Sequence, residues 1–336
     1  MGWIVSDPAS SSACLLESQP RAFHCVRDRE LDELVRQFWA QEVVASPTTG
    51  RLSQEDIACE EHFKRAHTRN PDGRYMVRLP FRDRPVRGGN SREIAAQMCG
   101  RMMRRFQRDP TFQQLYVDFM KEYLALGHME PSSCLPSTDE FFLPHHGVLS
   151  GSSTTTKLRV VFNGSRATSD GVSLNDTLHA GPKLQSELID VLLRWRCPAY
   201  VYTADVEKMF RQILLHPDGR RYQQIIWSDD ISMPPSAFQL STVTYGLKCA
   251  PYHSTRVLRQ LAEDEKSRFA LAVDVINRNT YVDDVLGGSD LIETAQQQVE
   301  QVDAMFRAGG FRLHKWSSNV PLILASVDPD RRVRIE

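Results

Sequence analysis

The stretch TYVDDVLG, residues 280–287, sets two adjacent acids between two short apolar runs. β-branched and aromatic residues flank the acids, and such residues favour strands, whereas aspartate favours turns. The stretch therefore predicts a β-hairpin whose tip carries Asp283 and Asp284. Two acids at a turn are by themselves ordinary polar turn residues, so their meaning depends on what lies beside them in the fold.

A third acid ends an apolar run upstream. In YVYTAD, residues 200–205, Asp205 is the last residue of a predicted strand. If this strand lies next to the hairpin, the carboxylates of Asp205, Asp283 and Asp284 converge at one sheet edge. A cluster of hard oxygen ligands is what a pair of divalent cations requires. The three acids therefore form a candidate site for two Mg²⁺ ions, with Mn²⁺ as an alternative.

The rest of the chain mixes strand and helix patterns. Short apolar runs predict strands, and apolar residues at helical spacing predict helices. Because several strands follow one another through tight turns, the pattern favours an α+β fold over a doubly wound sheet. The predicted strands are 141–150, 158–165, 211–218, 222–229, 238–246 and 311–317, and the predicted helices are 29–41, a segment that begins at 53, 110–127, 184–195, 251–263 and 291–308.

Charge is unevenly distributed along the chain. The 336 residues carry a formal net charge of −1, which is not typical of a protein that binds nucleic acid. Between Glu61 and Pro110, however, thirteen Lys and Arg stand against five Asp and Glu, a local charge of +8. Such a segment can bind a phosphate backbone through counterion release. The alternative is a solvated helix face that acids elsewhere balance.

Cysteine content and hydropathy indicate the setting. The seven cysteines are odd in number and none are spaced as CxxC, which argues against a disulfide framework or a structural zinc site. No run of about 18 apolar residues is present to span a membrane, and the first residues lack the pattern of a secretory signal. We therefore expect a reducing, intracellular setting and no membrane partner.

Three motifs in order resemble the palm motifs of reverse transcriptases. They are TADVEKMF at 203–210, STVTYGLKCAP at 241–251 and YVDD at 281–284. Further runs resemble one branch, the reverse transcriptase domain of BEL/Pao-type long-terminal-repeat retrotransposon polyproteins. The resemblance covers about residues 71–320. These further runs are VRLPFRDRP, FMKEYLALGHME, LPHHGV, TTTKLRVVFNGS, SLNDTLHAGPKLQ and LLRWR.

The resemblance implies a fold and a division of the chain. We expect a right-hand polymerase fold, with a palm made of an antiparallel sheet that carries helices on one face, and fingers, and with the thumb largely absent. Residues 1–50 would be a tail left from the end of a protease region. Residues 51–127 would form a basic, mostly helical segment, and residues 128–330 would form the fingers and palm.

The resemblance also implies roles for particular residues. Asp205, Asp283 and Asp284 match the catalytic carboxylates that bind metal. Phe210 matches the aromatic that favours deoxynucleotides by clashing with a ribose 2′-hydroxyl; the alternative is a core Phe. The remaining matches are Lys157 and Arg159, which would bind the incoming triphosphate, Tyr245 and Gly246, against which nucleotide and template would pack, and Lys315, a candidate proton donor or an ordinary surface Lys.

The function implied is that of an RNA-directed DNA polymerase, which adds nucleotides to a primer 3′-hydroxyl. Its partners would be an RNA or DNA template with a primer, deoxynucleoside triphosphates, and the RNase H and integrase domains of the polyprotein. The family implies a cytoplasmic location, in a virus-like particle. The alternative is a truncated, non-catalytic remnant that only binds nucleic acid.

Overall fold

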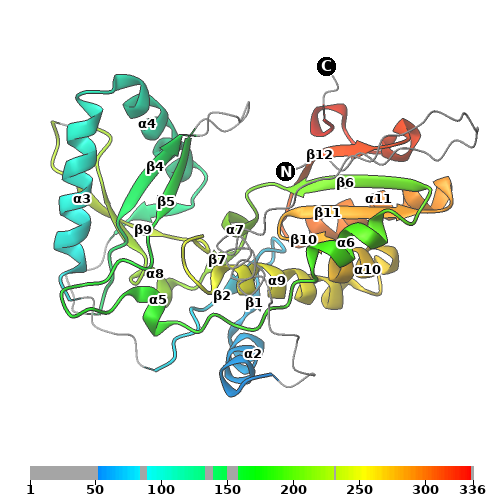
Figure 1. Ribbon diagram of the computed structural model, residues 1–336, viewed down its shortest axis with the longest axis horizontal. Coiled ribbons are helices and arrows are strands. Elements are labelled where there is room, and N and C mark those ends of the chain that lie inside the picture. Colours follow the sequence, from blue (N-terminus) through cyan, green and yellow to red (C-terminus); the bar gives the residue numbers. More distant parts are fainter. Residues whose placement is uncertain (1–51, 84–88, 133–138, 150–157, 231, 334–336) are drawn as a thin grey trace, which may run out of the picture. The chain divides into compact units, whose positions relative to one another are not determined.

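The computed structural model describes residues 52–83, 89–132, 139–149, 158–230 and 232–333. Within them, ten α-helices are combined with four small sheets whose strands pair mostly antiparallel (Figure 1). The predicted α+β fold class is therefore confirmed. In the described part of the chain, no helix is both long and apolar enough to cross a membrane.

One sheet has four antiparallel strands, in the order β10-β11-β6-β12. Its centre is β6 (Tyr200–Val206), in which Tyr202, Ala204 and Val206 alternate into the core as the period of two requires. Helices cover one face of this sheet (Figure 1). The other strands are β10 (Thr280–Tyr281), β11 (Asp284–Ser289) and β12 (Leu313–Ser318), and the helices are α6 (Leu188–Trp195), α10 (Ala270–Arg278) and α11 (Ile292–Ala308).

The longest of these helices shows why the sequence folds here. In α11, Ala295, Val299, Val302 and Phe306 recur at helical spacing and are fully buried, which places one apolar stripe against the sheet. The helix stops before Gly310, whose φ of +76° glycine adopts at low cost. A further helix, α9 (Ala250–Glu265), packs on α10 and α11.

A second group of elements surrounds a core of aromatic rings. Phe106, Phe112, Tyr116 and Trp227 lie within 6.2 Å of one another in successive ring contacts. Trp227 comes from a strand far along the chain from the two neighbouring helices that carry the other three rings, so packing, not local preference, brings it to them. The elements are α3 (Ser91–Phe106), α4 (Pro110–Ala125), the antiparallel pair β4 (His145–Leu149) and β5 (Leu158–Phe162), and the sheet β3 (Met129–Pro131), β9 (Ser236–Leu240) and β8 (Gln224–Trp227).

Short elements connect these groups. The helix α2 begins with a capping box in which Ser53 and Asp56 bond reciprocally, as the sequence predicted. The third sheet, β1-β2-β7, includes one parallel pair. The elements are α2 (Gln54–Ala66), β1 (Thr68–Arg69), β2 (Tyr75–Val77), α5 (Leu174–Thr177), α7 (Met209–Gln212), β7 (Leu214–Leu215), α8 (Pro217–Arg220), and the 3₁₀ turns η1 (Pro321–Leu324) and η2 (Pro329–Arg331).

Two strand predictions were wrong in extent. The segment 211–218 contains only the two residues of β7 as strand, because α7 turns the chain until Gln212 and Pro217 begins α8. The segment 238–246 is strand only to Leu240. Beyond it the chain makes single contacts, with the N–H of Ser241 donating to the carbonyl of His128 and Thr242 forming an isolated bridge with Leu214. The helix α10 was not predicted. The predicted helix 29–41 lies outside the described residues.

Candidate active site

The three acids that the sequence singled out lie at one end of the four-stranded sheet. In the antiparallel register of β11 and β6, Asp284 pairs directly with Asp205. The backbone N–H of Val206 donates to the carbonyl of Asp283 at 2.7 Å. Directly opposed residues of an antiparallel pair project to the same face with neighbouring side chains. The pairing therefore brings together carboxylates that stand 79 positions apart in the chain.

The hairpin that carries two of these acids has an unusual tip. Tyr281 pairs with Asp284, so Val282 and Asp283 form a two-residue loop. Val282 has a φ of +54°, at a position where two-residue hairpins of type II′ normally use glycine. For a β-branched residue this conformation is a genuine outlier that costs on the order of 1–3 kcal/mol. Strain of this kind is concentrated at functional sites.

Repulsion between the acids affects their protonation. The pKa of Asp283 is raised because surrounding atoms remove part of its hydration, and because Asp205 lies nearby; Lys315 and Arg159 oppose this shift. The pKa of Asp284 is raised by the same loss of hydration and then by the charges of Asp283 and Asp205. The acids are thus close enough to oppose one another's ionisation, which is the electrostatic setting that a bound cation would relieve.

A cation of the protein itself lies beside this cluster. Lys315 Nζ is 2.9 Å from Asp205 Oδ2, and His314 Nδ1 is 3.6 Å from Asp205 Oδ1. His314 pairs with Asp205 in the register of β12 and β6, and the register then shifts before Ser317. Lys315 has a φ of +52°. Because β-bulges re-aim side chains, this irregularity lets two consecutive residues reach the same carboxylate.

The residues predicted to bind triphosphate are only partly described. Arg159 lies on β5, opposite Val148, with an exposed side chain. Burial raises the pKa of both Asp283 and Tyr245, and the charge of Arg159 partly opposes each rise, so Arg159 lies within electrostatic reach of both. Lys157 lies outside the described residues.

Tyr245 and Gly246 lie against the β4–β5 pair. The hydroxyl of Tyr245 donates to the carbonyl of Val160. Gly246 has a φ of +101°, and a Cβ there would stand 2.1 Å from the carbonyl oxygen of Phe162, so only glycine fits. The ring of Phe210 on α7 is partly buried, with its centroid 6.5 Å from that of Tyr245. The structure thus brings Phe210 and Tyr245 together.

The sequence analysis missed a residue that holds this segment. The amide of Asn175 donates to the carbonyl of Gly246 at 2.9 Å, and its oxygen accepts from the backbone N–H of Lys248 at 2.9 Å. Asn175 lies in α5, which begins with a capping box formed by Ser173 and Asp176. The S-x-x-D spacing was a readable signal for the helix start. Nothing in the local sequence indicated the contact to Gly246.

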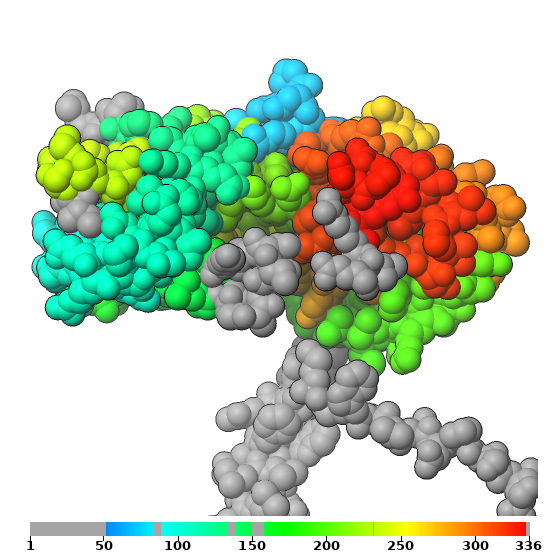
Figure 2. Space-filling view, turned by 90° about the horizontal axis from the view of Figure 1, so that it is seen from above, coloured from blue at the N-terminus to red at the C-terminus, as the bar shows by residue number. Residues whose placement is uncertain are grey.

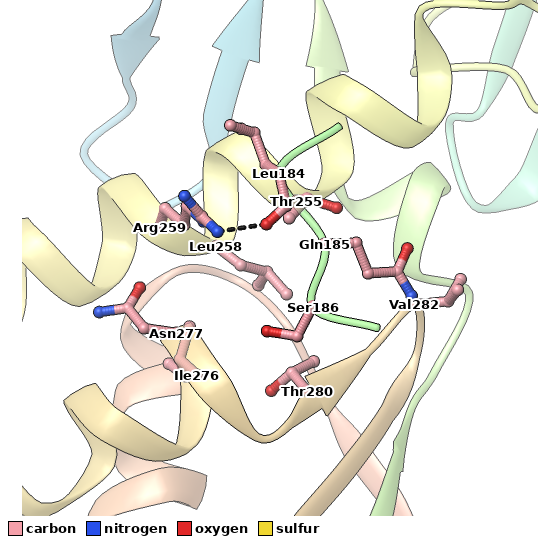
Figure 3. Close-up of a pocket in the computed structure, with 10 residues that line it drawn as sticks. All are labelled: Leu184, Gln185, Ser186, Thr255, Leu258, Arg259, Ile276, Asn277, Thr280 and Val282. Carbon is pink, nitrogen blue, oxygen red and sulfur yellow. Dashed lines mark hydrogen bonds between the residues drawn. The ribbon is translucent and has the colours of Figure 1, made fainter. Parts of the chain in front are cut away.

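A small cavity of about 10 Å³ lies behind the acid hairpin (Figure 3). It has room for about one water molecule. Val282 of the hairpin tip and Gln185 both line it, and the buried Nε2 of Gln185 has no hydrogen-bond partner among the described residues. Arg259 of α9 donates to the carbonyl of Leu184 on the opposite side. The cavity thus places the buried amide of Gln185 near Val282 of the hairpin tip.

The acids fit magnesium in their chemistry, although they are not arranged as a finished ligand set. Within the described residues, no group of three or more His, Cys, Asp or Glu side chains is placed so that it could hold a metal ion. Mg²⁺ needs only one or two protein carboxylates, because water and phosphate oxygens complete its shell. The register pair Asp205 and Asp284 supplies that number, and the ammonium of Lys315 would have to move aside.

Comparisons with known proteins do not extend these findings. No protein-family model matches the chain. No curated protein matches it at a significant level.

Proposed function

We propose that this chain is the catalytic part of an RNA-directed DNA polymerase, of the kind found in BEL/Pao-type retrotransposons. In this proposal the fold is that of a right-hand polymerase. The sheet β10-β11-β6-β12, with helices on one face, is the palm. The pair β4 and β5 belongs to the fingers.

The observation that supports the proposal most strongly is the register of the acids. The motifs at 203–210 and 281–284 resemble those of reverse transcriptases in amino-acid sequence alone. The pairing of Asp284 with Asp205 is a separate, three-dimensional property that the motifs do not contain. Together with the strained Val282 at the tip, it supports the proposal, because phosphoryl transfer depends on charge held in fixed positions.

Asp205, Asp283 and Asp284 would hold two Mg²⁺ ions. Magnesium bound there would lower the pKa of the attacking primer hydroxyl and neutralise charge on the triphosphate. The protein itself would contribute by holding the carboxylates at one sheet edge before the substrates bind. The short hairpin loop does this, because β10 and β11 leave only Val282 and Asp283 outside the pairing.

The remaining residues would position the nucleotide. Arg159 offers a planar guanidinium for bidentate contact with phosphate. Gly246, packed against the carbonyl of Phe162, would form part of the surface against which nucleotide and template pack. Phe210, held against Tyr245, would exclude the 2′-hydroxyl of a ribonucleotide. In this arrangement Lys315 would leave Asp205 and serve the leaving pyrophosphate.

The test is extension of a DNA primer on an RNA template by the full chain, with Mg²⁺, beside Asp283→Asn and Asp205→Asn. A matched control is Asp274→Asn, since Asp274 is an exposed aspartate of α10 that pairs with Arg278 and belongs to none of the three motifs. We expect extension by the parent and the control only, with primer–template binding retained in all four proteins. Extension by either acid variant near the parent rate would contradict the proposal.

A second candidate is a non-catalytic domain that binds nucleic acid. The ion pair between Lys315 and Asp205, and the lack of a finished three-ligand group in the described residues, favour it. Salt-sensitive binding of primer–template by the folded parent, without extension at any Mg²⁺ or Mn²⁺ concentration, would establish this candidate instead.

A further inference from the structure

Helix α3 carries four arginines on its exposed side. Arg101, Arg104, Arg105 and Arg108, here called the arginine stripe, recur at i, i+3, i+4 and i+7 and therefore share one face. All four are exposed. Arg108 follows the helix, but its N–H bonds to the carbonyl of Arg105 at 2.9 Å, so the turn continues. Figure 2 shows α3, in cyan, at the surface.

The part of the protein that the structure describes does not neutralise the arginine stripe. Among the described residues, no acid forms an ion pair with any of its members, whereas Arg92, on the same helix, approaches Glu140 at 3.9 Å. Clustered cations without acids attract a polyanion, because binding releases the counterions of that polyanion. Exposed charge alone does not show which ligand the stripe binds, because small ions of the solvent can also balance it. The surface beside the stripe must supply the specificity.

A groove lies beside the stripe, between α3 and β4. It encloses about 220 Å³ and is lined by Met98, Arg101, Met102, Arg105, Phe112 and His146. Its walls combine thioethers, which adapt to flat partners, with two arginines of the stripe. The groove thus offers an apolar slot with cations at its rim.

One arginine of the stripe is already stacked. The guanidinium of Arg105 lies 3.8 Å from the centroid of the buried Phe112 ring. A Cβ on Gly147 of β4 would stand 2.8 Å from Phe112 Cζ, so a glycine is needed for the ring to lie there. Contact with Phe112 orders the guanidinium plane before any ligand binds. Unstacked bases bind on such planes.

We propose that the arginine stripe and this groove form a binding surface for single-stranded nucleic acid. The stripe contacts successive phosphates, and the groove takes one unstacked base against Arg105. A duplex is disfavoured, because its bases are stacked and cannot enter the groove. This surface uses none of the three acids, so it stands or fails independently of the proposed polymerase activity.

The experiment measures binding of a fluorescein-labelled single-stranded RNA to the full chain by anisotropy, from 50 to 300 mM salt. The test variant is Arg101→Glu/Arg105→Glu. The matched control is Lys64→Glu/Arg65→Glu, which makes the same charge change at two exposed cations near the end of α2. A third variant, Arg105→Lys, keeps the charge and removes the planar group. Thermal melts of all the proteins check folding.

The binding constant for RNA falls as salt rises, and we expect the Arg101/Arg105 reversal to make this fall shallower. The slope of log K against log salt should become less negative by about 1.4, which is about 0.7 for each lost phosphate contact. The control pair should leave the slope unchanged. Arg105→Lys should keep the slope and weaken binding roughly five- to tenfold, through loss of base stacking. If the reversal variant does not fold, Arg105→Lys and Arg104→Gln still carry the test.

Three results would overturn the proposal. The first is equal loss in the α3 and α2 pairs, which would indicate a response to net charge alone. The second is unchanged binding in every α3 variant. The third is displacement of the RNA by polyglutamate of equal charge at the same concentration as unlabelled RNA, which would make the stripe a surface for acidic polymers in general.

Discussion

Lys315 Nζ lies 2.9 Å from Asp205 Oδ2, on a strand whose register shifts at that point. The shift and the φ of +52° at Lys315 aim its side chain to the face where Asp205 and Asp284 pair. The protein thus supplies a monovalent counter-ion to a carboxylate that we propose as a metal ligand. Lys315 and a metal ion bound at Asp205 would therefore compete for the same carboxylate oxygen.

We expect Lys315→Met to bind Mn²⁺ more tightly than the parent, by about thirtyfold, because one unit charge about 4 Å away opposes a divalent cation by about 2 kcal/mol in a water-like medium. Stability should change by less than about 1 kcal/mol, since the lysine of the pair is half exposed to solvent. Titration calorimetry of Mn²⁺ measures the first effect and urea unfolding the second. Lys266→Met, which removes an exposed lysine paired to Glu263, is the control, and equal affinity in both variants would contradict the idea of competition.

Gly246→Ala should lower the free energy of unfolding by more than the conformational cost alone. A new Cβ would stand 2.1 Å from the carbonyl of Phe162, a backbone atom that cannot turn away. Gly171→Ala isolates the conformational cost, because Gly171 has a φ of +77° and nothing within 4 Å of a new Cβ. We expect a loss of about 1–2 kcal/mol for Gly171→Ala and a clearly larger loss, or failure to fold, for Gly246→Ala. Similar losses in urea unfolding would show that the contact with Phe162 relaxes.

Asn175→Asp should also destabilise the fold, by about 2 kcal/mol. The substitution keeps the acceptor for the N–H of Lys248 but replaces the donor that bonds the carbonyl of Gly246. Asn163→Asp is its control, because the oxygen of Asn163 only accepts from the backbone of Ser165 and a carboxylate can do the same. If both substitutions have equal effects in urea unfolding, the bond to Gly246 contributes nothing measurable.

Local signals account for the parts of this structure that the sequence predicted. The hairpin around Asp283 follows from strand formers on either side of turn formers, and α11 follows from a repeated apolar spacing. The missed helix α10 carries the same signal, since Ala272, Val275 and Ile276 are buried at i, i+3 and i+4. Because α10 has 9 residues and α11 has 17, the apolar spacing repeats fewer times in α10 and is a weaker signal for a helix.

The parts that were wrong or missed depend on contacts between distant segments. The run ILL at 213–215 suits strand or helix equally, and pairing with β2 and the turn of α7 decide its length. The contact of Asn175 with Gly246 spans 71 positions. The bulge at Lys315 exists only relative to β6. The two partners of each contact lie too far apart in the chain for any local stretch of sequence to contain both.

Buried histidine gives the last prediction, which concerns pH. His145 is fully enclosed by the aromatic core; its Nδ1 lies 2.5 Å from the hydroxyl of Tyr116 and its Nε2 lies 3.1 Å from the carbonyl of Ile226. A neutral ring satisfies both, with Nε2–H donating and Nδ1 accepting. Burial lowers the pKa of His145 from 6.5 to about 4.

The sign of the effect follows from proton binding. Below pH 6.5 the unfolded chain takes up a proton at this position, whereas the folded chain does not until about pH 4. The free energy of unfolding should therefore fall as the pH is lowered between these values, by on the order of 3 kcal/mol from His145. Urea unfolding at pH 7 and pH 4.5 should show a smaller fall in His145→Gln than in the parent, because glutamine does not titrate. His146→Gln, which changes the exposed neighbour, should keep the parent's pH dependence. A pH dependence that is the same in all three proteins would mean that His145 has the same pKa in the folded and unfolded chains, and would contradict the lowering of its pKa by burial.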